Sequence, residues 1–467
     1  MEVRHLTHLA CLFVACLVPF LPLEAVEISN RDGQVIEVDI LEIEPSKIEI
    51  KLANGHVMWL ERSRLSEATE SMLESLEAKE AEAYKALNET LGIPLFVDQN
   101  LWDDPADELA KRLGWKQESK TESQSSYRSY PGENDRILQS RPYSAALYGG
   151  SGTVERLSII FANKGDFPAS GLASRDKIEA IENAIKADAE RIERLLTGQL
   201  GKPDRQRLGR GRSLRQRVHR WDWNSHAFLL ASEVGEYVTL RITPTDLADN
   251  KGRAERLSDA ALREQSKANL KTHENGDVIL QNIPMVNQGP KGYCVPATFE
   301  RYLRYLSIPA DMYVLAMAGQ TNVGGGTSLL NMMTALESYA ASQNRKLRQD
   351  ETTIDVRSVA KYIDNGLPLI WTMFSSKEYN TFVNQRTVER GKQNDWRAWK
   401  DRTRKEARRI ELRKDRMAAH ACMIIGYNKE TDEIAVSDSW GPRYELRWVP
   451  AEQAEQVSQG SIYLVDY

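Results

Sequence analysis

At 467 residues, the chain is too long for one ordinary domain and is expected to form about three. Hydrophobic residues make up 41% of it and charged residues 28%, which provides apolar side chains for packed cores and charge for a hydrated surface. The net charge of −5 argues against a nucleic-acid partner for the chain as a whole, because such proteins are usually basic.

The N-terminus predicts an export signal. A polar start that includes Arg4 precedes an almost wholly apolar run over residues 9–23, and Ala25 offers a small residue for cleavage. An apolar run of about 15 residues suits a signal peptide and is short for a membrane-spanning helix. We therefore expect residues 1–25 to be removed on export to the periplasm or the cell exterior, with no stable membrane insertion afterwards. An uncleaved anchor is the alternative.

Cysteine usage gives a first hint of chemistry. Cys11 and Cys16 fall in the predicted signal, so only Cys294 and Cys422 would remain in the mature protein. An exported protein with so few thiols is not a disulfide scaffold. A thiol retained in an oxidising compartment therefore invites a chemical explanation.

Residues 26–63 predict a small all-β unit. Apolar and charged residues alternate along three segments, and Asn54-Gly55 between the last two is a strong hairpin signal. The pattern resembles the small SH3-like barrels that follow signal peptides in some exported bacterial proteins. Residues 64–91 are rich in Glu, Ala, Lys and Leu and predict a helical connector, with its helix over residues 67–88.

Residues 92–250 predict an α+β domain of unknown role, without a recognisable catalytic motif. Its helices are expected near 104–113 and 174–196, and its strands near 144–148, 156–161, 221–231 and 237–243. The polar residues 118–140 predict a loop. Residues 202–220 carry eight Lys or Arg against one acid and predict a solvated basic loop, with an anion-binding patch as the alternative. Residues 251–276 are charged and predict a linker.

The catalytic domain is expected over residues 277–467, with Cys294 as its candidate nucleophile. Thiols react as thiolates, so the site must lower the thiol pKa. The apolar spacing over residues 295–306 predicts a helix, and its dipole would favour an anion at Cys294. Gln288 could join the Cys294 backbone N–H in holding the oxyanion of a tetrahedral intermediate. The alternatives are a buried structural cysteine and an ordinary loop glutamine.

Two later segments supply candidate partners for the thiol. His420 starts an apolar run that predicts a core strand, and an imidazole there can pair with a thiol and later protonate a leaving amine. Asp438 starts the turn Asp438-Ser439-Trp440-Gly441, and a carboxylate that accepts the imidazole N–H would fix its tautomer. Trp440 would shield this hydrogen bond from water. A packed core histidine and a turn aspartate are the alternatives.

Together, Gln288 with Cys294, His420 before its apolar run, and the turn at Asp438 resemble the papain-like cysteine peptidases. The resemblance implies a two-lobed fold, with a helical lobe led by the cysteine helix and a β lobe that carries the histidine and the acid. Papain itself has Asn in place of Asp438. This difference and the sequence of residues 294–298 point toward bacterial relatives, similar to the C39 peptidases that trim bacteriocin leaders and that also use Asp. The resemblance does not imply leader cleavage by this chain, because no transporter domain accompanies the site.

Other features of this region are less specific. Gly324, Gly325 and Gly326 would bring backbone against an extended peptide substrate, with a plain loop as the alternative. The charged residues 377–414 predict an inserted helix that either gates the cleft or is merely solvated. Cys422, on the predicted histidine strand, is expected to be a small core residue. No His, Cys and Asp cluster has the spacing of metal ligands, so no metal or other cofactor is expected.

The sequence thus predicts a multidomain α+β protein with an SH3-like β unit, a central α+β domain and a papain-like two-lobed domain. Its expected function is that of an exported cysteine peptidase, acting on polypeptides through Cys294, His420, Asp438 and an acyl-enzyme. A cell-wall amide hydrolase or transamidase with the same site, and a non-catalytic envelope binding protein, are the alternatives. Residues 26–276 are expected to restrain or position the catalytic domain.

Overall fold

The computed structural model describes residues 25–97, 100–166, 175–209, 213–252, 257–322 and 326–467. It divides into two compact units: Met1–Gln99 with Arg194–Lys202, and Asn100–Glu193 with Pro203–Tyr467. The predicted signal lies outside the described residues, apart from Ala25 at its end. Within the described part of the chain, no helix has both the length and the apolarity needed to cross a membrane.

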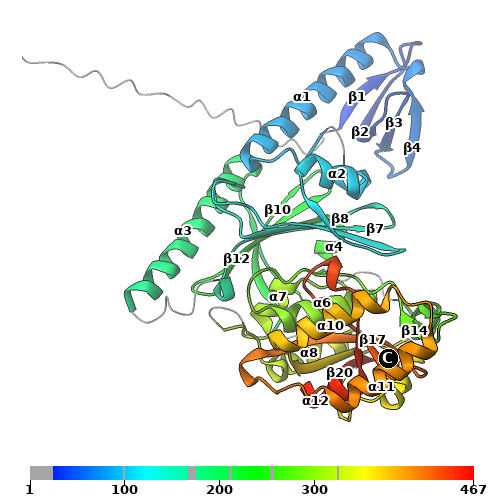
Figure 1. Cartoon of the computed structure of the whole chain (residues 1–467). Coiled ribbons are helices and arrows are strands. Elements are labelled where there is room, and N and C mark those ends of the chain that lie inside the picture. The colour runs from blue at the N-terminus through cyan, green and yellow to red at the C-terminus, as the bar shows by residue number, and fades with distance from the viewer. Residues whose placement is uncertain (1–24, 98–99, 167–174, 210–212, 253–256, 323–325) are drawn as a thin grey trace, which may run out of the picture. The chain divides into compact units, whose positions relative to one another are not determined.

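The first unit contains a four-stranded antiparallel sheet and a long helix (Figure 1). The strands follow one another in chain order: β1 (Val26–Ser29), β2 (Val35–Ile43), β3 (Lys47–Leu52) and β4 (Val57–Glu61). Helix α1 (Glu67–Leu91) begins after Ser66, whose side chain caps the helix by accepting from the Thr69 N–H. The alternation that predicted these strands buries Ile48 and Ile50 against Leu73 of α1. The SH3-like resemblance stays a prediction.

The second unit contains an eight-stranded antiparallel sheet, called here the central sheet, in the order β5-β6-β7-β8-β12-β11-β10-β9. Its strands are β5 (Lys116–Lys120), β6 (Gln124–Ser129), β7 (Ser144–Gly150), β8 (Thr153–Asn163), β9 (Asp204–Leu208), β10 (Gln216–Trp223), β11 (His226–Glu233) and β12 (Tyr237–Pro244). The helices of this region are α2 (Ala106–Leu113), α3 (Arg175–Leu200) and α4 (Thr245–Asp249), and the end of α3 from Arg194 belongs to the first unit.

The loop expected over residues 118–140 is wrong, because most of β5 and the whole of β6 lie within it. Polar composition suggested solvent exposure, yet Glu118, Ser126 and Arg128 are all buried. Their side chains bond to one another, which satisfies polar groups that would otherwise be costly to bury. Polar residues therefore face inward here.

Two further expectations for the central region also need correction. The single strand expected over 221–231 is a hairpin, since Asn224 and Ser225 turn the chain with φ angles of 42° and 60° between β10 and β11. The basic segment 202–220 is largely β-sheet, because β9 pairs with β10 from Gln216 to Arg220. Residues 210–212 of that segment lie outside the described residues.

The second unit also contains a sheet called here the C-terminal sheet, which follows the order β13-β14-β17-β16-β20-β15, with β18 pairing β17 and β19. Its strands are β13 (Leu270–Thr272), β14 (Asp277–Leu280), β15 (Lys346–Glu351), β16 (Leu369–Phe374), β17 (Ala419–Asn428), β18 (Glu433–Ser437), β19 (Arg447–Pro450) and β20 (Ser458–Asp466). The helices are α5 (Asp259–Ala268), α6 (Cys294–Tyr305), α7 (Met312–Ala318), α8 (Leu329–Ser342), α9 (Val356–Ile363), α10 (Lys377–Arg390), α11 (Trp396–Arg409) and α12 (Ala451–Val457).

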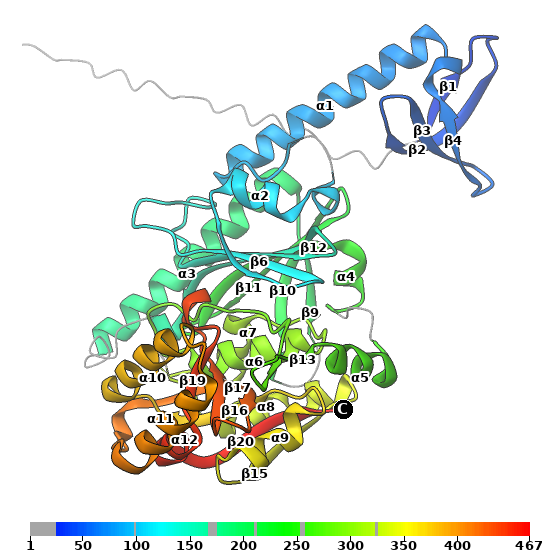
Figure 2. The same ribbon diagram turned by 45° about the vertical axis from the view of Figure 1, so that its right-hand side comes forward.

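Helix α6 is buried on all sides, from Val295 to Tyr305. Phe299 and Tyr302 pack into the large apolar core that also contains residues of β17. Ala297 instead joins a smaller cluster with Ile160 of β8, because α6 and α7 lie between the central and C-terminal sheets (Figure 2). A helix in this position must find partners for every polar side chain that it carries.

The inserted helix expected over residues 377–414 is two helices, α10 and α11. Asp395 starts the second by accepting from the Arg397 and Ala398 N–H groups. One face of the insertion is anchored, because Arg386 of α10 reaches the buried carboxylate of Glu433 on β18 at 2.9 Å. Most of α11 is exposed apart from Trp399 and Thr403.

Candidate active site

Cys294 is the first residue of α6, as the apolar spacing predicted. The residue before it, Tyr293, makes no side-chain cap, so the first N–H groups of the helix are left to interact with the site. Pro296 lies in the first turn, where a missing N–H costs little. The start of a helix favours an anion such as a thiolate.

His420 lies near the start of β17, beside the cysteine helix. It is opposite Met373 in the pairing of β17 with β16. The Thr298 hydroxyl of α6 donates to the carbonyl of Ala421 at 3.3 Å, which fixes the helix against the strand next to the histidine. The structure therefore brings Cys294 and His420 together, and their side chains are hydrogen-bonded.

The two groups shift each other's protonation. Burial raises the pKa of the Cys294 thiol, but the hydrogen bond and charge of His420 reverse this and hold that pKa below its usual value. Burial likewise lowers the pKa of His420, but its hydrogen bonds with Asp438 and Cys294 raise the pKa to about 9. At neutral pH these pKa shifts favour a Cys294 thiolate beside a His420 imidazolium. The thiolate is the reactive form of a thiol.

Asp438 lies behind the imidazole and is fully buried. Its Oδ1 is 2.8 Å from His420 Nε2, so the other ring nitrogen, Nδ1, is left for the thiol. Burial raises the pKa of Asp438, but the charge of Arg447 and the hydrogen bond from His420 outweigh it and lower the pKa. The acid is thus ionised where it can hold the imidazole in one orientation.

Trp440 covers the histidine, as expected from the turn sequence. Its ring stacks on the His420 ring with centroids 4.7 Å apart and planes inclined by 28°. The indole lies where it can keep water from the imidazole–carboxylate hydrogen bond, which strengthens that bond.

Arg447 is a residue of the site that the sequence reasoning missed. It forms a buried ion pair with Asp438 through Oδ2. The side chains of Asn380 and Asn384 on α10 accept from its Nη1 at 2.9 and 3.1 Å. A signal was present, because Arg447 is a charged residue at the start of an otherwise apolar strand, β19.

Gln288 lies in the loop before α6 and is tied to the turn after Asp438. Its N–H donates to the carbonyl of Ser439 at 2.8 Å. Its side-chain Nε2 donates to the carbonyl of Lys291 at 3.1 Å, a contact that uses one of the two Nε2 hydrogens. The loop thus fixes the amide while leaving a donor for another acceptor.

The glycine stretch can be described only in part. Gly324 and Gly325 lie outside the described residues. Gly326 has a φ of +92°, and its N–H donates to the carbonyl of Gly292 at 2.8 Å. It therefore supports the loop that leads to Cys294.

Cys422 differs from Cys294 in its surroundings. It belongs to the apolar core and is 1% exposed. Burial raises the pKa of its thiol well above the usual value, which keeps it protonated and inert. Across the described ranges, no three His, Cys, Asp or Glu side chains are grouped so that they could hold a metal ion.

Residues 280–460 match the Peptidase_C39 like family. The matched range contains Cys294, His420 and Asp438, and it supports a papain-like cysteine peptidase in this part of the chain. Peptidases cleave peptide bonds, so the match also implies a polypeptide substrate. No curated protein matches the chain. The family match does not extend to the central sheet or to the first unit.

Proposed function

We propose that this protein is a cysteine peptidase whose reaction passes through an acyl-enzyme on Cys294. The observation that carries the proposal is the hydrogen bond between Cys294 and His420, within a segment that matches a peptidase family. A buried carboxylate on the far ring nitrogen completes the arrangement, at 2.8 Å. Nucleophile, base and orienting acid in this order form the arrangement used for acyl transfer.

In the proposed first half-reaction, the Cys294 thiolate attacks the carbonyl carbon of the scissile peptide bond. The carbonyl oxygen becomes an oxyanion, which Nε2 of Gln288 and the Cys294 N–H stabilise. The C–N bond then breaks as the His420 imidazolium gives its proton to the leaving amine. The product is a thioester on Cys294 and a neutral imidazole.

In the second half-reaction, His420 takes a proton from water as the water oxygen attacks the thioester carbonyl. The C–S bond breaks, the carboxylic acid leaves, and the thiolate–imidazolium pair returns. Asp438 stays ionised throughout, because its function is to orient and stabilise the imidazolium.

We also propose that the peptidase is exported, on the evidence of the apolar run over residues 9–23. N-terminal sequencing of the protein from the culture medium or periplasm should give Val26 as the first residue. A protein that stays with the membrane and begins at Met1 would contradict cleavage.

The proposed nucleophile is tested by Cys294→Ala, with Cys422→Ala as the matched control. Hydrolysis of unfolded casein should fall to background in the first variant and persist in the second. Full activity in the Cys294→Ala variant would overturn the assignment. Muropeptides assayed in parallel separate a peptidase from a cell-wall amide hydrolase that uses the same groups.

A further inference from the structure

We propose that the central sheet is a positioning element of the active site, which places the oxyanion donor Gln288 through Glu118, Ser119 and Tyr130. The inference rests on the proposed function. It assigns a role to the central sheet, which lies outside the range that matches the peptidase family. Its basis is a set of contacts between the first strands of the central sheet and the segment that leads to the nucleophile.

Three side chains hold this segment from the central sheet. The Glu118 carboxylate accepts from the N–H of Asn287 at 2.7 Å, and the Ser119 hydroxyl accepts from the N–H of Met285 at 2.9 Å. The hydroxyl of Tyr130, just beyond β6, donates to the carbonyl of Asn287 at 2.7 Å. Both backbone groups of the residue before Gln288 are therefore held by the central sheet.

The catalytic domain holds the same segment from its own side. Arg301 of α6 donates from Nε to the carbonyl of Pro284 at 2.9 Å and from Nη2 to the Ser437 hydroxyl at 2.5 Å. The Gln288 N–H reaches the carbonyl of Ser439. Residues 284–288 belong to no strand. Because buried backbone groups need partners, the position of this segment depends on both sides.

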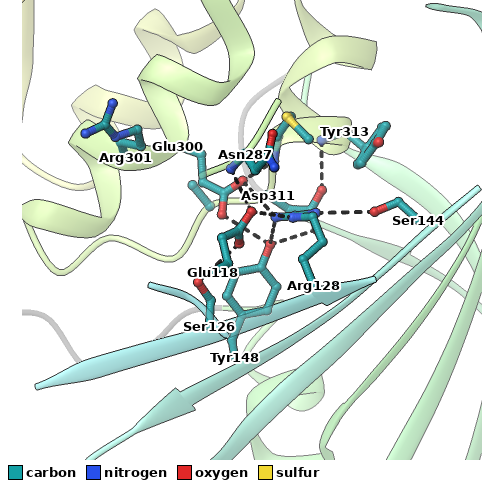
Figure 3. Close-up of polar contacts among 12 residues, drawn as sticks. Glu118, Ser126, Arg128, Ser144, Tyr148, Asn287, Glu300, Arg301, Asp311 and Tyr313 are labelled. Carbon is teal, nitrogen blue, oxygen red and sulfur yellow. Dashed lines mark hydrogen bonds and ion pairs between the residues drawn. The ribbon is translucent and has the colours of Figure 1, made fainter. Parts of the chain in front are cut away.

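The carboxylate that holds Asn287 is itself fixed. Arg128 donates from Nε to Glu118 Oε1 at 2.7 Å, and the Ser126 hydroxyl donates to Oε2 at 3.2 Å (Figure 3). All three side chains are buried. A buried ion pair with its oxygens this well satisfied has little freedom to move, so it suits a positioning contact.

The same network reaches the cysteine helix. Arg128 lies 3.9 Å from the carboxylate of Glu300 on α6. The Tyr148 hydroxyl of β7 donates to Glu300 at 3.1 Å and lies 3.4 Å from Asp311, whose other oxygen caps α7 (Figure 3). The central sheet is therefore bonded both to the segment before the nucleophile and to the helix that carries it.

One glycine shows how closely the two parts approach. Gly289 has a φ of +70°, and a Cβ added there would lie 2.8 Å from the Tyr130 hydroxyl oxygen. Glycine alone tolerates this conformation and this contact without strain. Gly289 thus leaves room for the Tyr130 ring, whose hydroxyl binds Asn287 on the other side of Gln288.

The test is a double-mutant cycle in the full-length protein. Tyr130→Phe removes only a hydroxyl, so the fold should persist, and we expect kcat to fall about 5-fold with KM nearly unchanged. Gln288→Ala should lower kcat about 100-fold, which is typical for the loss of one oxyanion donor. Adding Tyr130→Phe to Gln288→Ala should cost nothing further, because the hydroxyl acts through the missing amide.

The substrate for these rates is an internally quenched peptide taken from a site that the wild-type protein cleaves in casein. Tyr362→Phe is the control, since it also loses one hydroxyl hydrogen bond, to Asp350 of β15 at 2.6 Å. This control should leave kcat unchanged. Alkylation of Cys294 by iodoacetamide should be as fast in Tyr130→Phe as in the wild type, because His420 sets the reactivity of the thiolate.

Three results would overturn the inference. The first is an unchanged kcat in Tyr130→Phe, and the second is an equal loss of kcat when Tyr130→Phe is introduced into the wild type and into Gln288→Ala. The third is slower alkylation of Cys294 in Tyr130→Phe. The second result would mean that the lost hydroxyl disturbs the active site independently of Gln288. The third would mean that it changes the reactivity of the Cys294 thiolate. Failure of the proposed function looks different, because the Cys294→Ala variant would then keep its turnover.

Discussion

Asp438 divides its two carboxylate oxygens between His420 and Arg447. Oδ1 lies 2.8 Å from the imidazole, and Oδ2 pairs with the guanidinium. With the thiolate and imidazolium forms of Cys294 and His420, the buried site holds two negative and two positive charges. Arg447 therefore balances the buried charge of Asp438 and helps to hold the pKa of this carboxyl below its usual value.

The first prediction concerns this ion pair. Arg447→Met leaves the buried Asp438 without its guanidinium, and we expect the free energy of unfolding to fall by about 3–5 kcal/mol. Urea denaturation of the full-length protein measures it. The exposed Arg443, in the short helical turn before β19, provides the matched control Arg443→Met, which should leave the unfolding midpoint nearly unchanged. Equal midpoints for both variants would show that the pair does not stabilise the fold.

The second prediction concerns the alkaline limit of activity. Leaving-group protonation needs the imidazolium, so kcat/KM should fall as the pH rises through the His420 pKa of about 9. Asp438 raises this pKa through a hydrogen bond and its charge. Asp438→Asn removes the charge, so the alkaline limb should move to lower pH by about one unit. The control is Glu445→Gln, at an exposed position, which should leave the pH dependence of kcat/KM unchanged. If kcat/KM of Asp438→Asn still falls near pH 9, Asp438 does not raise the pKa of His420.

The sequence was most informative where a residue's neighbours along the chain define its place. An apolar helix follows Cys294, an apolar strand follows His420, and a short turn contains Asp438. The structure brings these three side chains together. Arg447 could not be assigned in this way, because its role depends on a partner in another element and on its burial.

The loop wrongly expected over residues 118–140 shows the same limit. Strands are recognised by alternation of apolar and polar residues, on the assumption that polar side chains face water. Glu118 and Arg128 do not fit that assumption, since they are buried, bond to each other and lie against the segment before α6, where Glu118 accepts from the Asn287 N–H. Only the folded chain shows that the partner of Glu118 is an arginine on the next strand.

The third prediction concerns the reactivity of the nucleophile. Because the pKa of Cys294 is lowered, its thiolate persists at pH values where an ordinary thiol is protonated. Iodoacetamide should therefore alkylate Cys294 rapidly even below pH 8, with Cys422 unlabelled in the folded protein. His420→Ala removes the group that lowers the pKa, so alkylation should then require a higher pH. Mass spectrometry of tryptic peptides separates the two cysteines.

A rate profile for Cys294 that matches free cysteine would contradict this prediction. The prediction would also be contradicted if the pH dependence of Cys294 alkylation were the same in His420→Ala as in the wild type. In urea-unfolded protein both cysteines should be labelled equally. This control shows that the reagent can react with Cys422 once the fold no longer buries it.

The last prediction concerns the anchoring of the inserted helices. Glu433 is fully buried and accepts from Arg386, Arg390 and the Trp399 Nε1–H at 2.9, 2.9 and 3.0 Å. Glu433→Gln removes one of two carboxylate partners from each guanidinium, because Arg390 keeps Asp277 and Arg386 keeps Glu406. We therefore expect the free energy of unfolding to fall by about 1–3 kcal/mol. The exposed Glu411→Gln should leave the urea midpoint unchanged.

The same variant should also affect catalysis, because α10 supports the site through Asn380 and Asn384, which hold Arg447. We therefore expect Glu433→Gln to lower kcat/KM under conditions where the variant remains folded by circular dichroism. If stability falls while kcat/KM is unchanged, the insertion is an anchored cover that does not act on the site. If neither changes, the buried carboxylate has no role in holding α10 against β18, and Asp277 and Glu406 are enough to balance the two arginines.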